Sequence, residues 1–160
     1  MADLLAVAAD LPERELAAGE ALLTAGDPSG SLFVLLSGAL VVRREDADIA
    51  VIDHPGSVVG EVALLLEREH RSTVLAVEAT RVKVAEDGAA FMAAHPEVLR
   101  AVAESLAHRV DVVSGYLADI RSQYADVPGM HLVSTVLGRL SENHGPHPEP
   151  GSEREPDPEY

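Results

Sequence analysis

The segment GEVALLLEREHRSTV, residues 60–74, places a glycine–glutamate pair before a short apolar block and an arginine before two hydroxyl residues. The apolar block has the composition of one or two helical turns, and the first amides of a helix have no acceptor within it. These amides carry partial positive charge, and Gly60 lets a ligand approach them closely. Arg71 can then close over an anion with a two-pronged contact, while Ser72 offers a hydroxyl and an amide. The segment therefore predicts a seat for a small phosphate diester.

Each residue of this segment also has a simpler explanation. Alone, Glu61 would be a first-turn acid that complements the helix dipole, and Arg71 would be a surface arginine beside acidic neighbours. Ser72 and Thr73 would be ordinary residues at the start of a strand. Together, in this order and spacing, the four residues favour the anion site. Glu61 then lies at its edge, where a carboxylate can accept hydrogen bonds from a sugar hydroxyl attached to the phosphate.

The composition of the chain narrows the classes of protein and of site. Its 160 residues suffice for one domain with a hydrophobic core. The absence of cysteine excludes disulfides, thiolate zinc sites, iron–sulfur clusters and cysteine nucleophiles. A formal net charge of −15, from 27 acidic and 12 basic residues, opposes binding to the phosphate backbone of nucleic acids.

The sequence predicts no targeting or membrane segment. Residues 1–10, MADLLAVAAD, contain acidic residues and lack the positively charged N-terminal region of a signal peptide. No apolar run approaches the roughly 18–20 residues that cross a bilayer. We therefore expect a cytoplasmic protein that binds neither membranes nor nucleic acid.

Residues 13–86 predict a β-rich domain that follows a short opening helix. Two strands, broken at Ser37-Gly38, lie within SLFVLLSGALVVRRED, and a third lies within DIAVIDHPG. Two more strands lie within STVLAVEATRVKVAE, broken at residues 78–80. Short strands separated by recurring turn signals are typical of a small sandwich or barrel.

A helical period replaces the strand pattern from residue 88 onward. A short helix is predicted at 88–94 and a long one at 96–125, with Pro96 in its first turn. Apolar residues recur along the long helix at steps of three or four and form one stripe: Leu99, Val102, Leu106, Val110, Val113, Leu117, Ile120 and Tyr124. Such a stripe packs either on its own domain or on a second helix. Its near-heptad spacing favours a two-fold helix pair, and hence a homodimer.

The C-terminal residues divide into two predicted segments. Residues 127–143 contain one more short amphipathic helix. Residues 144–160, HGPHPEPGSEREPDPEY, contain five of the ten prolines and five acids, and this composition predicts a disordered tail. The predicted domain therefore spans residues 1–126 and includes the long helix.

The opening segment resembles the phosphate-binding cassette of cyclic nucleotide-binding domains, the family of the bacterial catabolite-activator protein and the regulatory subunits of cyclic-nucleotide-dependent kinases. The family's glycine–glutamate opening matches Gly60-Glu61, its small-apolar block matches residues 63–65, and its phosphate arginine matches Arg71. Residues 17–42 are similar to the family's first strands, and residues 95–115 resemble the activator's dimer-forming helix. The resemblance covers about residues 13–124.

This resemblance implies an α+β, mainly β fold: an eight-stranded antiparallel β-roll of jelly-roll type, flanked by helices, with the nucleotide inside the roll. Glu61 would take the ribose 2′-hydroxyl, and Arg71 and Ser72 would hold the cyclic phosphate. In the bacterial activator a threonine–serine pair on the long helix contacts the adenine, and here that pair reads Val113-Ser114. The expected ligand-binding residues are Gly60, Glu61, Val62, Ala63, Arg71, Ser72, Thr73 and Ser114.

The family's transcription factors continue into a winged-helix DNA reader, and no such domain is recognisable after residue 143. We therefore expect a non-enzymatic, stand-alone sensor of cAMP, or of cGMP, that signals through its long helix to an effector protein of unknown identity. One alternative is a degenerate domain that binds no ligand and serves dimerisation or scaffolding. Another is a metal enzyme, but the seven histidines form no pair with metal-ligand spacing, and no metal is expected.

Overall fold

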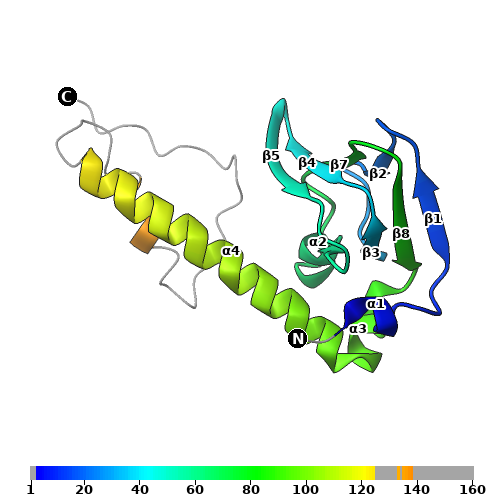
Figure 1. Ribbon diagram of the computed structural model, residues 1–160. Coiled ribbons are helices and arrows are strands. Elements are labelled where there is room, and N and C mark those ends of the chain that lie inside the picture. The colour runs from blue at the N-terminus through cyan, green and yellow to red at the C-terminus, as the bar shows by residue number, and fades with distance from the viewer. Residues whose placement is uncertain (1–2, 125–132, 134, 139–160) are drawn as a thin grey trace. The chain divides into compact units, whose positions relative to one another are not determined.

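The computed structural model describes residues 3–124, 133 and 135–138. The chain divides into two compact units, Met1–Ala107 and His108–Tyr160. The described strands all lie in the first unit, where they form two four-stranded sheets (Figure 1).

The first sheet has the order β1 (Glu13–Leu16), β8 (Thr80–Ala85), β3 (Leu32–Ser37) and β6 (Val58–Val59). The second has the order β2 (Ala21–Leu23), β7 (Thr73–Ala76), β4 (Leu40–Arg44) and β5 (Ala47–Ile52). All neighbouring strands are antiparallel. Only β4 and β5 are consecutive in both the chain and a sheet, so the chain otherwise alternates between the two sheets. The predicted eight-stranded antiparallel β-roll is confirmed.

Strand β3 is buried on both faces, which explains its continuous apolar sequence. Phe33 and Leu35 join a core cluster drawn from both sheets, which also contains Leu16, Leu22, Leu40, Val59, Val74, Ala76 and Val82. Leu32 points to the opposite side and packs with residues of the helices. Because side chains alternate along a strand, one six-residue strand serves two cores.

Four helices contribute side chains to this second core: α1 (Leu4–Val7), α2 (Glu61–Leu65), α3 (Gly88–Ala94) and the start of α4 (Pro96–Gln123). The predicted short and long helices therefore form at the predicted places. Val98 and Val102, four residues apart, are the buried residues of α4, whereas Leu99 of the predicted stripe is 43% exposed. Residues 133 and 135–138 are helical. The rest of the predicted helix at 127–143, and the predicted tail at 144–160, lie outside the described residues.

A buried threonine joins the turns at one end of the two sheets. The Thr80 hydroxyl accepts from the amide of Ala39 at 3.2 Å, and the carbonyl oxygens of Ala39 and Glu78 lie within donating distance at 3.1 and 2.9 Å. Gly38 adopts a φ of +91°, and a Cβ there would lie 2.5 Å from the Thr80 hydroxyl oxygen. The break predicted at Ser37-Gly38 is thus a tight turn against β8.

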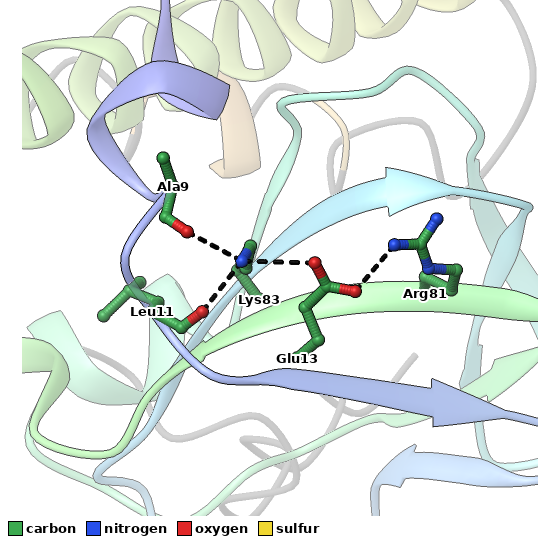
Figure 2. Close-up of polar contacts among 5 residues, drawn as sticks. All are labelled: Ala9, Leu11, Glu13, Arg81 and Lys83. Atoms are coloured by element: carbon green, nitrogen blue, oxygen red, sulfur yellow. Dashed lines mark hydrogen bonds and ion pairs between the residues drawn. The ribbon is translucent and has the colours of Figure 1, made fainter.

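Figure 2 shows a second polar cluster, which ties the N-terminal segment to the first sheet. The Lys83 ammonium donates to the carbonyl oxygens of Ala9 and Leu11 at 2.8 and 2.9 Å, and it lies 3.2 Å from a Glu13 carboxylate oxygen. Arg81 donates to the other oxygen of Glu13 at 2.7 Å. Lys83 is the only lysine of the sequence, and its side chain is 12% exposed.

The hydrogen bonds from Arg81 and then Lys83 hold the pKa of Glu13 below its ordinary value. Since the pKa of Glu13 is lower in the folded protein than in the unfolded chain, this carboxylate stabilises the fold above its unfolded pKa. That contribution is lost as the pH falls through the folded pKa.

We predict that Lys83→Met lowers the free energy of unfolding by about 1.5–3 kcal/mol, because two backbone carbonyls lose a charged donor. Urea denaturation at neutral pH measures this change. Arg81→Met is the matched control: it removes an exposed partner of the same Glu13, and an exposed ion pair contributes little. Equal losses in the two variants would contradict the anchoring role of Lys83.

Candidate functional site

Gly60 connects β6 to helix α2 (Glu61–Leu65) in a left-handed backbone conformation. Its φ is +96°, a region that residues with a Cβ rarely adopt. A Cβ at this position would also lie 2.8 Å from the carbonyl oxygen of Ser31. Glycine is therefore required for two reasons, and the close approach to Ser31 sets where the first turn of α2 begins.

The first turn of α2 places backbone donors directly after this glycine. Leu64 donates to the Gly60 carbonyl at 3.3 Å, so the amides of Val62 and Ala63 precede the first amide with an intrahelical acceptor. Ala63 is buried and Val62 is exposed. Because α2 has only five residues, its macrodipole is small, and an anion here would depend on individual N–H groups.

Glu61 is only 6% exposed, which is uncommon for a carboxylate. An acid that merely complements a helix dipole has no need to leave water. The burial of Glu61 therefore weakens the simpler explanation of this residue and favours a carboxylate held for specific polar partners.

Arg71 and Ser72 immediately precede β7, and Thr73 is its first residue. All three side chains are half-buried. The Ser72 hydroxyl oxygen accepts from Arg44 Nε at 3.3 Å, which leaves its own proton for another acceptor. The Thr73 hydroxyl accepts from the amide of Ala25 at 3.1 Å. The structure thus gives Thr73 a role in holding the loop after β2.

The backbone of His70 ties the same loop to the residue before Arg71. His70 donates its amide to the Asp27 carbonyl at 2.9 Å and accepts from the Gly26 amide at 2.8 Å. His70 itself is 8% exposed. Arg71 therefore projects from a backbone that is fixed on both sides, by His70 and by the Thr73 hydroxyl.

The structure adds a residue that the sequence analysis did not single out, Arg68. Its side chain is half-buried, and its Nε is the one buried side-chain nitrogen or oxygen in the described part of the chain that has no hydrogen-bond partner. Burial lowers the pKa of Arg68, and the nearby positive charges of Arg71 and Arg44 lower it further. The positive charges of Arg44 and Arg71, from two parts of the sequence, therefore both act on Arg68.

These three arginines also differ from others in the unit in their pairing. Ion pairs join Arg14, Arg43, Arg81 and Arg100 to carboxylates. Within the described ranges, Arg44, Arg68 and Arg71 form no ion pair. In a chain with more than twice as many acidic as basic residues, a group of unpaired cations indicates a site for an external anion.

Ser114 lies on α4 in the second unit and is half-buried, and its contact with a base stays a prediction.

The described residues were also compared with the requirements of a metal site and of a membrane span. No group of three or more histidines, cysteines or carboxylates that could hold a metal ion occurs among the described residues. None of the described helices has the length and apolar character needed to cross a bilayer.

The model of the cyclic nucleotide-binding domain family matches residues 13–93. The chain belongs to this family. The matched range begins at β1 and includes every strand, Gly60, α2 and the three unpaired arginines.

Solved structures of this family share the fold. The catabolite activator protein of Thermus thermophilus is 25% identical with a TM-score of 0.61, over 72% of this chain and 57% of that one. The chain thus corresponds to little more than half of the Thermus protein. The N-terminal domain of a transcriptional regulator from Streptomyces coelicolor A3(2) is 24% identical with a TM-score of 0.52, over 71% of this chain and 86% of that one. PKAR CBD2 bound to Sp-2Cl-cAMPS is 21% identical with a TM-score of 0.54, over 74% of this chain and 87% of that one.

We predict that Gly60→Ala destabilises the protein by more than the roughly 1–2 kcal/mol of a left-handed backbone alone, because the new methyl group meets the Ser31 carbonyl. Gly26→Ala is the control, since Gly26 has a similar φ of +91° but nothing within 4 Å of an added Cβ. Thermal and urea unfolding of both variants measure the difference. An equal loss would show that the contact with Ser31 is not a constraint.

Proposed function

We propose that this protein is a sensor of a cyclic nucleotide, cAMP or cGMP, and that the phosphate binds between the first turn of α2 and the start of β7. Arg71 makes a two-pronged contact with the phosphate, and Ser72 donates its hydroxyl proton. The amides of Val62 and Ala63 add two further donors. The observation that carries this proposal is that Arg71, which has no ion pair among the described residues, and two helical amides without an intrahelical acceptor both lie in the range that the family model matches.

The neighbouring residues take supporting roles in this proposal. Gly60 allows the nucleotide close to the backbone, and Glu61 accepts hydrogen bonds from the ribose 2′-hydroxyl. Thr73 contributes its backbone, because its hydroxyl is engaged by Ala25. Ser114 of α4 contacts the base. The side chain of its neighbour Val113 can neither donate nor accept a hydrogen bond. Base recognition therefore depends on fewer polar contacts than phosphate recognition does.

We further propose that the signal leaves through α4. Several apolar residues of this helix are more than 40% exposed, among them Val110, Val113 and Tyr116. Apolar surface at helical spacing gains stability when a second helix covers it. A two-fold pairing of α4 helices would make the protein a homodimer, and a change in that pair is what an effector protein would detect.

We predict that Arg71→Ala lowers the affinity for cAMP or cGMP about ten- to a hundredfold, since a charge-assisted hydrogen bond is lost. Isothermal titration calorimetry with both nucleotides measures the affinity. Arg43→Ala serves as control, because Arg43 is exposed and its partner is Asp48. Unchanged affinity in Arg71→Ala would refute the assigned pose. Absence of binding by the parent protein would favour a dimerisation or scaffold module.

We predict that Val113→Asp shifts the homodimer toward monomer, because it buries an unpaired charge in the helix pair. Val112→Asp is the matched control: Val112 is as exposed as Val113, at 54% against 52%, but lies off the predicted stripe. Light scattering coupled to size-exclusion chromatography reports the mass. If the parent protein is already monomeric at micromolar concentration, the helix-pair proposal is wrong.

A further inference from the structure

The turn after α2 holds Arg68 in place at an energetic cost. Glu67 adopts a φ of +49°, although glycine is the usual residue at this position after a helix. The amide of Arg68 donates to the carbonyl oxygen of Ala63 at 3.1 Å, and the amide of Glu67 donates to the carbonyl oxygen of Leu64 at 3.3 Å. These two bonds form a Schellman motif, in which the residue at the position of Arg68 is typically apolar and contacts the last turn of the helix.

Here that position carries a guanidinium group. Its Nε is buried without a partner, and a buried polar group without a partner destabilises the folded state. A strained residue in the turn and an unsatisfied donor beside it are both unfavourable to folding alone. Both are accounted for if the guanidinium of Arg68 binds an anion that the protein takes up from solution.

Arg44 reaches a residue of the proposed phosphate site from strand β4. It is the last residue of β4, and the preceding Arg43 pairs in register with Thr73 of β7. Arg44 Nε donates to the Ser72 hydroxyl, which links it directly to a residue of the proposed phosphate site. Arg44 is thus joined to the residue next to Arg71, the one arginine that the proposed pose uses, and the positive charges of Arg44 and Arg71 both act on Arg68.

The summed charge of the residues proposed for this site does not match that of a cyclic mononucleotide. A cyclic phosphate diester carries one negative charge. Arg44, Arg68 and Arg71 have three positive formal charges and Glu61 has one negative formal charge, which leaves two positive charges for the ligand to neutralise. Glu67 and Glu69 flank Arg68 in the sequence, yet no ion pair joins either of them to these arginines among residues 3–124.

We propose that Arg68 and Arg44 are further ligand-binding residues of this site, and that the preferred ligand is a nucleotide with two negative charges. This inference rests on the proposed function, because it concerns the same phosphate site. Two kinds of nucleotide share this chemistry. A cyclic dinucleotide carries two phosphate diesters, and a nucleoside monophosphate carries one phosphate group with nearly two charges at neutral pH.

Calorimetric titrations of the parent protein with cAMP, AMP and cyclic di-AMP at pH 7.5 and constant salt test this proposal. The expected result is that AMP or cyclic di-AMP binds about tenfold or more tightly than cAMP, since each charge-assisted hydrogen bond contributes about a factor of ten. The better of the two ligands identifies whether the charges lie on one phosphate or on two. Equal or weaker binding of both, relative to cAMP, would overturn the proposal and leave the cyclic mononucleotide site intact.

Arg68→Gln separates the role of this side chain from general electrostatics. It keeps much of the length and removes the charge, and we expect the affinity for the doubly charged ligand to fall about ten- to a hundredfold. The affinity for cAMP should change about threefold or less, so the preference disappears. Arg81→Gln is the control for loss of one positive charge in the same unit, because Arg81 and its partner Glu13 both lie in the first sheet whereas β7 lies in the second. Equal effects of the two variants would overturn the role of Arg68.

The two proposals fail in distinguishable ways. If none of the three nucleotides binds the parent protein, the proposed function is refuted, and this inference is refuted with it. If cAMP binds in a way that depends on Arg71, and neither AMP nor cyclic di-AMP binds more tightly than cAMP, the proposed function stands and only the doubly charged ligand is refuted. Urea denaturation of Arg68→Gln checks that the variant folds, and the buried unpaired donor predicts that it is as stable as the parent or more so.

Discussion

The site depends on the contact between Gly60 and the backbone of strand β3. With a φ of +96° and only 2.8 Å between a hypothetical Cβ and the Ser31 carbonyl oxygen, this glycine lets the chain turn from β6 into α2 against the strand. The first amides of α2, the buried Glu61 and the Schellman turn that carries Arg68 all follow within eight residues. A displacement of this turn would therefore move the two proposed amide donors of α2, those of Val62 and Ala63, at once.

Electrostatics give the second constraint, because the net charge of the chain opposes the binding of an anion. A net charge of −15 repels anions at a distance, so an anion site must be local and must exclude the protein's own carboxylates. The arrangement of Arg44, Arg68 and Arg71 meets this requirement. Ordinary surface arginines of the first unit pair with nearby acids, as Arg43 does with Asp48. By contrast, Arg44 donates to the half-buried Ser72 hydroxyl, and no ion pair joins Arg44, Arg68 or Arg71 to a carboxylate among the described residues.

Much of the fold follows from local signals in the sequence. Runs of apolar residues separated by turn signals locate β3, β4, β7 and β8, and Pro96 marks the start of α4. The buried residues of α4 were harder to predict, because Val98, which the predicted stripe omits, is buried by its contacts with β3, β8 and α3. A stripe counted from Leu99 describes the exposed residues better than the buried ones.

The candidate site was predictable in part, for similar reasons. Residues at fixed spacing, such as Gly60, Glu61, Arg71 and Ser72, form a pattern within one segment. The role of Thr73 depends on Ala25, 48 residues away, and no local pattern shows that contact. Arg68 lies inside the segment 60–74. Only two structural features distinguish it from a surface arginine: the left-handed conformation of the preceding Glu67 and the burial of the Arg68 Nε.

The central claim is that an anionic nucleotide binds at the first turn of α2 and the start of β7. Amide NMR spectra of the full chain, recorded while cAMP is added, test it most directly, because each backbone donor reports on its own surroundings. The account predicts that the largest shifts occur at residues 60–63 and 71–73, with smaller ones at residues 25–27. Saturable shifts confined to other parts of the chain, or none at all at millimolar nucleotide, would contradict it.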